Sequence, residues 1–453
     1  MMAGKQQAGL ASRDGRANTG ATRPKGGYVS DEKRWDSAYE FKIMVMLSLA
    51  FGLVGLDRFI LPPLFGLKSS TMAQDLGLNY QDLGNLVSIL AICWGACAVL
   101  FGMLADRLGR RAVLVPAIVA FSVMSMFSGL ATGLVSLFLV RALMGVAEGP
   151  VASTGVAVAV DASHPKRRGM NNGIFQCTIS LFGNGFGPLI AAQLLAIATW
   201  RHVFFIVGIP GLIVAIIMWF VVREPAKLAS ERGGGPVQRA PLSQIFKHRN
   251  LPLAMITLMC AMTGIFVLGA MMPSYLTDYL KLSDGQAAVI SSAIGFGGAL
   301  GQFGLLTVSD FIGRRLATLA SYLVSAVFLW FFIHTGPNFP VLFALLFVTA
   351  MFNFGALAIL AGPVGAEAAP AGLVASAAGL VIGAGEIFGG GLAPAIAGGI
   401  AQHSGIQYTL YFAMGGQVLG FLIALFLQET APRRAKVAAG GAVSELDSAP
   451  GAG

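Results

Sequence analysis

Long apolar segments separated by short polar loops fill the chain from about residue 43 to residue 428. Many windows hold about 20 predominantly apolar residues, the length that an α-helix needs to cross the hydrocarbon core of a bilayer. The pattern predicts an all-α membrane protein with twelve transmembrane helices. The predicted spans are 43–64, 83–105, 112–131, 134–160, 170–196, 202–222, 251–272, 286–308, 316–334, 340–361, 371–400 and 408–428.

A polar segment rich in Gly, Pro and charged residues, 223–250, divides the predicted spans into two sets of six. Such a composition is typical of a linker. We therefore expect two six-helix bundles, 43–222 and 251–430, joined by a cytoplasmic linker. The ends of the chain, 1–42 and 431–453, are polar, which predicts disordered cytoplasmic tails, and the first contains no apolar core of a signal peptide.

Composition and charge strengthen the membrane assignment. The chain is 56% hydrophobic and 11% charged, whereas soluble domains carry about 25% charged residues. If both termini lie in the cytoplasm, 25 of the 30 Lys and Arg residues fall on that side and three on the other. This asymmetry predicts that both termini lie in the cytoplasm. It also attributes the net charge of +9 to membrane topology rather than to nucleic-acid binding.

One loop motif occurs twice, 204 residues apart: "GMLADRLGRR" at 102–111 and "LTVSDFIGRR" at 306–315. Each copy carries an acid, a glycine and two arginines at matching positions. We expect the acid to accept hydrogen bonds from the next helix's N-terminus, the glycine to permit a tight turn and the arginines to lie at the headgroups. The residues of interest are Gly102, Asp106, Arg107, Gly109, Arg110, Arg111, Asp310, Gly313, Arg314 and Arg315.

The first copy resembles the signature loop of the major facilitator superfamily, G-x-x-x-D-R-x-G-R-R, and matches it throughout. The second copy departs from it, with Leu306 in place of the glycine and Phe311 in place of the first arginine. The resemblance implies a secondary transporter, not an enzyme, in which two six-helix bundles rock around a site at the membrane midplane. It also implies that the loop residues form a latch between the bundles and do not touch the substrate.

Five charged residues are predicted inside the spans, where burying a charge costs about 2.5–3.5 kcal/mol on insertion scales. They are Asp57 and Arg58 in "GLVGLDRFILPP", Arg141 and Glu148 in "VRALMGVAEGPVAS", and Glu386 in "GAGEIFGGGLAP". Arg141 and Glu148 lie two helical turns apart and share a face. Two acids and two bases from helices 1 and 4 could therefore pair across a central cavity. Such a set is a candidate proton-coupling device; the alternative is an ion-pair staple between two helices.

The charges of helices 1 and 4 resemble those of the anion:cation symporter family, whose bacterial members include importers of sugar acids such as galactonate. The resemblance implies that Asp57 and Glu148 accept the proton and that Arg58 and Arg141 bind the substrate's carboxylate or hold the acids. Spinster-type lipid transporters show a similar arrangement. Glu386 stands where we expect a neutral polar residue in sugar-acid importers, which leaves the substrate open. Glu386 is itself a candidate substrate-binding residue, for a hydroxyl or a cationic group of the substrate.

Helix 5 contains "GNGFGPLIAA", 183–192, which resembles an antiporter motif except for its final alanines. It predicts close packing at Gly183 and Gly187 and a kink at Pro188, and it keeps efflux as an alternative. Further polar residues in apolar surroundings are candidates for contact with a hydroxylated substrate or for helix–helix hydrogen bonds. They are Gln176, Asn184, Asn353 and Gln417.

The sequence predicts a monomeric, proton-coupled importer of a small organic anion: a sugar acid, an aromatic acid or another carboxylate. The proton is the coupling ion, and we expect no other cofactor and no metal, since no nucleotide-binding loop or metal-ligand spacing is present. The alternatives are a proton-driven antiporter that exports a drug or an amphiphilic, lipid-like substrate, and a transporter-like receptor without flux.

Overall fold

The computed structural model describes residues 36–164, 167–223, 249–367 and 374–431. Most of the predicted N-terminal tail, the linker from 224 to 248 and the end of the chain from 432 lie outside these residues. By its contacts the chain divides after Asp36, and the unit described below begins at Ser37. All regular secondary structure in the described residues is helical, as predicted.

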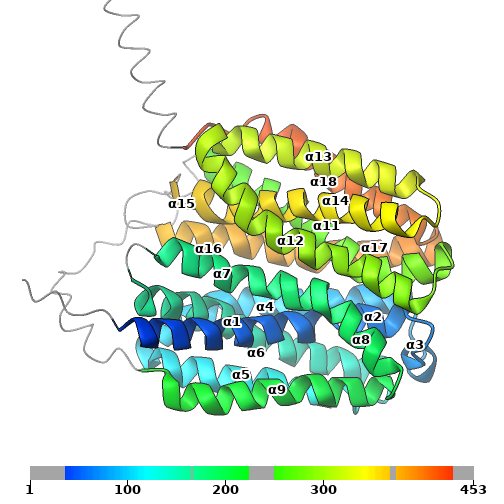
Figure 1. Ribbon diagram of the computed structural model, residues 1–453, viewed down its shortest axis with the longest axis horizontal. Coiled ribbons are helices and arrows are strands. Elements are labelled where there is room, and N and C mark those ends of the chain that lie inside the picture. Colours follow the sequence, from blue (N-terminus) through cyan, green and yellow to red (C-terminus); the bar gives the residue numbers. More distant parts are fainter. Residues whose placement is uncertain (1–35, 165–166, 224–248, 368–373, 432–453) are drawn as a thin grey trace, which may run out of the picture. The chain divides into compact units, whose positions relative to one another are not determined.

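The helices before the linker form the lower part of Figure 1. We call the end of the bundle at which the first helix begins the near end and the opposite end the far end. The elements are α1 (Ser37–Phe59), α2 (Leu61–Gly66), α3 (Met72–Asp75), α4 (Tyr80–Leu108), α5 (Arg110–Ser128), α6 (Leu134–Ala162), α7 (Arg168–Ser180), the π-helical η1 (Leu181–Phe186), α8 (Gly187–Leu195) and α9 (Trp200–Val221).

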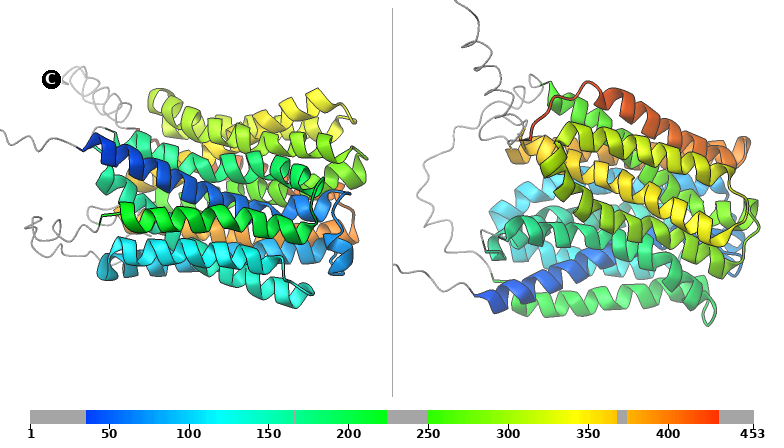
Figure 2. Two further views of the ribbon diagram at one scale, coloured as in Figure 1. Left: turned by 60° about the horizontal axis from the view of Figure 1, so that its bottom comes forward. Right: turned by 45° about the horizontal axis from the view of Figure 1, so that its top comes forward.

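The helices after the linker form the upper part of Figure 1 and run in the same general direction in both views of Figure 2. They are α11 (Asn250–Ser274), η3 (Tyr275–Tyr279), α12 (Asp284–Ile312), α13 (Arg314–His334), α14 (Phe339–Ile359), η4 (Leu360–Val364), α15 (Gly365–Glu367), α16 (Val374–Ala384), η5 (Gly385–Leu392), α17 (Ala393–His403) and α18 (Gln407–Ala424). In the described residues, eleven helical segments are long and apolar enough to cross a membrane. The shorter α18 lies at the twelfth predicted span.

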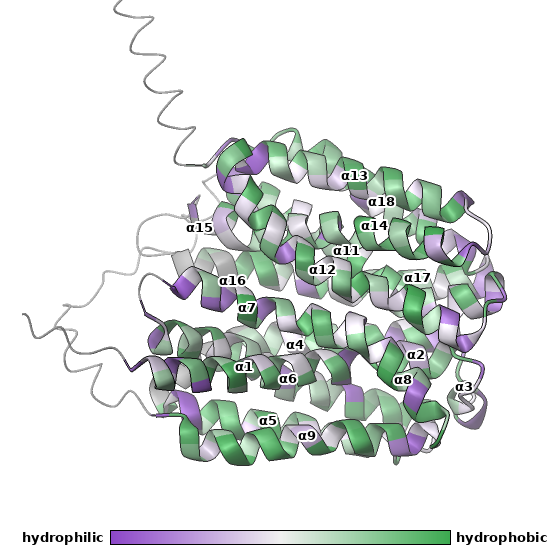
Figure 3. Ribbon diagram, viewed as in Figure 1, coloured by the Kyte–Doolittle hydropathy of each residue, from purple (hydrophilic) through white to green (hydrophobic). Residues whose placement is uncertain are grey.

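The outer faces of the helices are apolar, as a surface in contact with lipid requires. On α9 the exposed residues Ile209, Ile213, Ile216 and Phe220 recur every three or four positions and form one apolar stripe. The other face of the same helix is buried against the bundle. Figure 3 shows apolar residues along the middle of the helices and polar residues at their ends. This is the surface of a multi-pass membrane protein, with lipid as the solvent around the middle of the bundle.

Prolines coincide with the places where the helices widen. Pro188 and Pro394 follow η1 and η5, respectively, within two residues of the π-helical segment. A proline supplies no N–H to the turn before it and clashes with the carbonyl four residues earlier, so the ladder of hydrogen bonds must adjust there. At Pro188, where the sequence predicts a kink, the adjustment takes the form of this wider turn.

Glycines determine how closely some helices approach. A methyl group on Gly183 would lie 2.7 Å from the carbonyl oxygen of Gly55, and one on Gly55 would overlap the backbone of Ile179. The predicted close packing at Gly183 is therefore confirmed. The same prediction for Gly187 is wrong, because its nearest neighbour would lie at an ordinary 3.5 Å.

The two copies of the loop motif share one backbone conformation. Gly109 has φ of 98° and Gly313 has φ of 100°, and each directly precedes a helix. Side chains rarely tolerate this left-handed region, whereas glycine enters it at little cost. The predicted tight turn is confirmed in both copies.

Candidate functional site

The five charged residues that the sequence places inside the spans lie in one buried cluster. Asp57 and Arg58 come from α1, Arg141 and Glu148 from α6, and Glu386 from η5. Their exposed fractions range from 0% for Arg141 and Glu148 to 6% for Glu386. Glu148 lies close enough to both arginines and to Glu386 to interact with them electrostatically, and Asp57 interacts in the same way with Glu148 and Arg141.

Arg58 forms an ion pair with Glu386. Its Nη2 lies 2.8 Å from Oε2 of Glu386, and both side chains are over 90% buried. Because α1 precedes the linker and η5 follows it, this ion pair joins the two halves of the chain. From the sequence we expect Arg58 to pair with an acid of α1 or α6, Asp57 or Glu148; the hydrogen-bonded acid is instead Glu386 of η5.

Aromatic rings surround the Arg58 guanidinium. Its Cζ atom lies 4.7 Å from the ring centre of Phe266, 5.2 Å from that of Trp94 and 5.8 Å from that of Phe59. These rings come from α11, α4 and α1, so three elements hold the cation in place. Ring faces attract a guanidinium and exclude water, which strengthens any charge pairing inside the site.

Two glycines make room for the ion pair. A methyl group on Gly390 would lie 3.2 Å from Oε2 of Glu386 and 2.9 Å from the ring of Phe266. One on Gly95 would lie 3.3 Å from Cβ of Glu386. The glycine-rich sequence around Glu386 therefore lets η5 approach α4 and α11 closely at this level.

Arg141 binds the backbone of α1. Its Nη1 donates to the carbonyl oxygen of Asp57 at 3.1 Å and its Nη2 to that of Arg58 at 3.0 Å. The carbonyl of Arg58 needs a donor from outside the helix. Its helical partner would be the N–H of the residue four positions later, but that residue is Pro62, which has no N–H. The guanidinium thus caps the C-terminal end of α1, where the helix dipole also favours a cation.

The two acids beside the arginines differ in their hydrogen bonding. Oδ1 of Asp57 accepts a hydrogen bond from the hydroxyl of Ser125 on α5, at 2.7 Å. In the described residues, Oδ2 of Asp57 and both oxygens of Glu148 have no hydrogen-bond partner. Glu148 is thus a fully buried carboxyl group whose charge is balanced only through space, by Arg58 and Arg141.

Three of the four polar candidates adjoin α11. A methyl group on Gly264 would lie 2.5 Å from Nδ2 of Asn353 and 3.1 Å from Nε2 of Gln417, and one on Gly269 would lie 3.0 Å from Oδ1 of Asn184. Each of these buried amides has at least one atom without a hydrogen-bond partner in the described residues. The fourth candidate, Gln176, is half-buried on α7.

In the first copy of the loop motif, the surroundings of Gly102 and the side chains of Asp106 and Arg107 lie outside the described part of the structure. Arg110 donates to the carbonyl of Ala157 at 2.7 Å and forms an ion pair with Asp161, both on α6. Arg111 lies over the ring of Trp219 on α9, at 4.3 Å. These contacts join helices of the same half, and the latch between the halves stays a prediction.

The second copy corrects one expectation. Asp310 was expected to accept hydrogen bonds from the start of the next helix, but it pairs with the side chain of Arg314, at 2.5 Å. The backbone N–H groups of Arg314 and Arg315 instead donate to the carboxylate of Glu429, at 2.8 and 3.2 Å. An acid more than 100 residues away in the sequence therefore caps α13, which no local pattern indicates.

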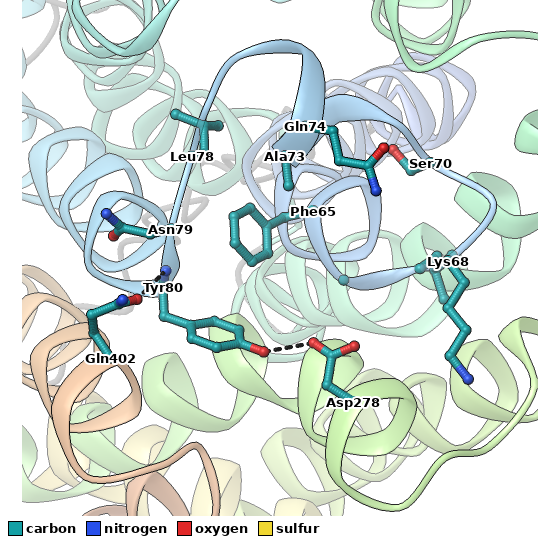
Figure 4. A pocket seen from close by; sticks show the side chains of 12 residues that line it. Phe65, Lys68, Ser70, Ala73, Gln74, Leu78, Asn79, Tyr80, Asp278 and Gln402 are labelled. Carbon is teal, nitrogen blue, oxygen red and sulfur yellow. Dashed lines mark hydrogen bonds between the residues drawn. The ribbon is translucent and has the colours of Figure 1, made fainter.

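The far end carries contacts between the halves that no sequence pattern predicts. The Tyr80 hydroxyl donates to Asp278 at 2.7 Å, beside a cavity of about 440 Å³ (Figure 4). The carboxylate of Asp284 accepts hydrogen bonds from the backbone N–H groups of Lys68 and Ser69, at 2.9 and 2.7 Å. Polar residues at helix ends are common in any membrane protein, so nothing in the sequence distinguishes these.

Comparisons with known proteins agree with the fold. The model of the Major Facilitator Superfamily matches residues 47–307 and 254–448. A probable L-galactonate transporter of Escherichia coli K12 is 27% identical over 314 residues, covering 63% of this chain and 67% of the relative. The D-galactonate transporter of Escherichia coli O6:H1 is 24% identical over 413 residues, and this alignment covers 85% of this chain and 94% of the relative. The 4-hydroxybenzoate transporter PcaK of Pseudomonas aeruginosa is 24% identical, covering 65% and 71%.

Solved structures show the same fold. A crystal structure of a bacterial homologue of the human lysosomal transporter Spinster, in an inward-facing and occupied conformation, superimposes with a TM-score of 0.69. It is 18% identical in sequence, and the superposition covers 86% of this chain and 97% of the Spinster homologue. The family model spans nearly all of the described helices, and the repeated loop and buried charges lie within the matched residues. The chain is therefore a membrane transporter that belongs to the Major Facilitator Superfamily.

Proposed function

We propose that this transporter is a proton-coupled importer of a small organic anion, in a bacterial inner membrane with both termini in the cytoplasm. One observation carries the proposal: a buried arginine, Arg58, binds a carboxylate between the two halves of the chain. The relatives named for galactonate and 4-hydroxybenzoate support a carboxylate as substrate. Sugar acids and aromatic acids both fit this chemistry.

Arg58 is the proposed receptor for the carboxylate. A guanidinium presents paired N–H donors in one plane, which match the two oxygens of a carboxylate better than a lysine ammonium does. Arg141 adds a second positive charge to the site, while its Nη atoms hold the end of α1 from which Arg58 projects. Asn184, Asn353 and Gln176 are proposed to contact hydroxyl groups of the substrate.

Asp57 and Glu148 are the proposed proton carriers. The cluster contains two arginines and three acids, which gives a formal charge of −1 when all are ionised. A bound monoanion would make the buried charge more negative, and protons taken up by the acids offset this cost. The loaded site can then move between the two sides of the membrane without carrying a large excess charge, as alternating access requires.

The test is gradient-driven uptake into proteoliposomes of labelled D-galactonate, D-glucuronate and 4-hydroxybenzoate. We expect the wild type to concentrate at least one of these anions under an imposed proton gradient, and Arg58→Lys to lose this uptake. Arg201→Lys is the matched control, because Arg201 lies at the far end and outside the cluster. Uptake by Arg58→Lys at the wild-type rate would contradict the role of the guanidinium.

Neutral variants of the acids test the coupling. Asp57→Asn and Glu148→Gln mimic the protonated groups, so we expect them to exchange labelled for unlabelled substrate in counterflow but not to accumulate it from a proton gradient. If both variants still concentrate the anion when driven only by protons, the coupling groups lie elsewhere in the chain.

A further inference from the structure

Building on the proposed function, we propose that Glu386 is an internal competitor of the substrate: its carboxylate occupies the position on Arg58 that the substrate's carboxylate takes. Binding of the substrate then displaces Glu386 and breaks the ion pair between the two halves. The starting observation is the contact itself, a buried carboxylate 2.8 Å from the guanidinium that is the best anion receptor of the site.

The surroundings of Arg58 leave little room for two carboxylates at once. Phe266, Trp94 and Phe59 lie against the guanidinium, so its approaches are restricted to the directions that the rings leave open. Glu148 already lies close to both Arg58 and Glu386. A second carboxylate added beside Glu386 would place three acids around one cation, and like charges in a buried site repel strongly. Replacement of Glu386 avoids this repulsion.

The chain around Glu386 permits such a displacement. Gly385, Gly389, Gly390 and Gly391 lie within the same π-helical segment, and glycine opposes backbone rearrangement least of all residues. Because Gly390 has no side chain, the space beside Oε2 of Glu386 is not taken by a Cβ atom. The helix that carries the acid therefore places no Cβ atom against the carboxylate on this side, where the ring of Phe266 is the nearest other group.

Displacement has a consequence for the conformation. Arg58 moves with α1 and Glu386 with η5, and these elements lie in different halves of the chain. While the ion pair is intact, it holds the halves together at the level of the site. Substrate binding removes this link in the same step that fills the site, and release of the substrate restores it. Arg58 therefore has a carboxylate partner in both the loaded and the empty transporter, and either form can move without exposing an unpaired buried cation.

The first experiment uses acetate as the probe and needs no knowledge of the substrate. In purified Glu386→Ala, the carboxylate is missing and Arg58 is left with a vacant position, so acetate should raise the unfolding temperature in a saturable manner. Wild type should show no such effect, because Glu386 fills the position. The double variant Arg58→Ala/Glu386→Ala should also be insensitive. Glu367→Ala is a matched control, since it removes an acid 3.2 Å from Arg314, outside the site.

Equal acetate effects in wild type and Glu386→Ala, or an effect that persists in the double variant, would overturn the proposal. If Glu386→Ala does not fold, Glu386→Gln serves in the second experiment, because it keeps the shape and removes the charge. Binding of D-galactonate and 4-hydroxybenzoate to Glu386→Gln, measured by calorimetry, should be about tenfold tighter than to wild type for whichever probe the wild type binds. Unchanged or weaker binding would refute the competition.

The two experiments separate this proposal from the proposed function. Acetate binding that depends on Arg58 and on the removal of Glu386, in a protein that transports none of the tested anions, would support the displaceable carboxylate and reject the importer. Transport of an anion by wild type, together with unchanged affinity in Glu386→Gln, would support the importer and reject the internal competitor.

Discussion

The contact between Arg141 and the end of α1 leads to a prediction about stability. Arg141→Met keeps an unbranched apolar stem but removes the guanidinium and with it both donating groups. The carbonyl groups of Asp57 and Arg58 then lose hydrogen bonds of 3.1 and 3.0 Å, and the acids of the cluster lose one of two cations. Hydrogen bonds to charged groups contribute about 1.5–3 kcal/mol each. We therefore expect the free energy of unfolding to fall by about 3–6 kcal/mol, the sum of two such hydrogen bonds.

A second substitution isolates the contribution of the backbone. Pro62→Ala supplies an N–H four residues after Arg58, and the intervening Ile60 already has helical angles, φ −74° and ψ −28°. The new N–H can donate to the carbonyl of Arg58 in place of the guanidinium. Arg141→Met should then cost about 1 kcal/mol less in the Pro62→Ala protein than in the wild type, the net value of one hydrogen bond. Pro116→Ala, inside α5, is the matched control and should leave the cost of Arg141→Met unchanged.

The assay is reversible unfolding of the purified protein in mixed micelles, followed by far-ultraviolet circular dichroism, for wild type, the single variants and the double variants. Independent substitutions add within about 0.5 kcal/mol. If the cost of Arg141→Met is the same, within this margin, with proline or alanine at position 62, the guanidinium does not act by capping α1. Its effect would then come from the charge cluster alone.

Two further predictions concern other parts of the structure. A methyl group on Gly295 of α12 would overlap the backbone of Gly185 in η1, so Gly295→Ala should lower the free energy of unfolding by about 1–3 kcal/mol. Gly304→Ala on the same helix, where a methyl group meets nothing within 4 Å, should not; equal losses would refute the role of this close approach. Outside the spans, a hydrogen bond from the Trp200 indole lowers the pKa of Asp75. A carboxyl group whose pKa is lower in the folded than in the unfolded protein stabilises the fold at pH values above its unfolded pKa, about 3.9 for Asp. Protonation at lower pH removes this contribution. The melting temperature of the wild type should therefore exceed that of Asp75→Asn by less as the pH falls below about 4. A constant difference from pH 3 to pH 6 would contradict it.

The sequence sufficed for those features that depend on the solvent or on a single residue's conformation. The apolar length of the spans follows from the thickness of the bilayer, and most described helices begin and end within a few residues of the predicted positions. The exceptions are α1, which begins at Ser37 rather than at 43, and the seventh span, which continues through η3 to Tyr279 rather than ending at 272. The left-handed turns at Gly109 and Gly313 could be predicted because glycine alone adopts them readily. The buried charges could be singled out because charges inside a membrane are rare and need partners.

The choice of partner could not be predicted, because it depends on which helices face each other. Glu386 was recognised as unusual, but only the packing of η5 against α4 and α11 brings it to Arg58. The role of Arg141 depends on the backbone of another helix, to which side-chain charges give no clue. The same limit applies to Glu429, which caps α13 from the other end of the C-terminal half.

The order of residues at the end of α1 explains how one helix serves both halves of the protein. Asp57 and Arg58 are adjacent, so on a helix their side chains point about 100° apart. Asp57 accordingly contacts Ser125 of its own half, whereas Arg58 reaches Glu386 of the other half. The proline that follows leaves a carbonyl of this turn for Arg141, which ties the backbone to α6. The turn is thus fixed within its own half through the backbone and Asp57, and Arg58 forms its ion pair with the other half, beside the ring contact between Phe59 and Phe266. A ligand that competes for Arg58 can therefore break this ion pair without loosening the turn that presents the proton-binding acid.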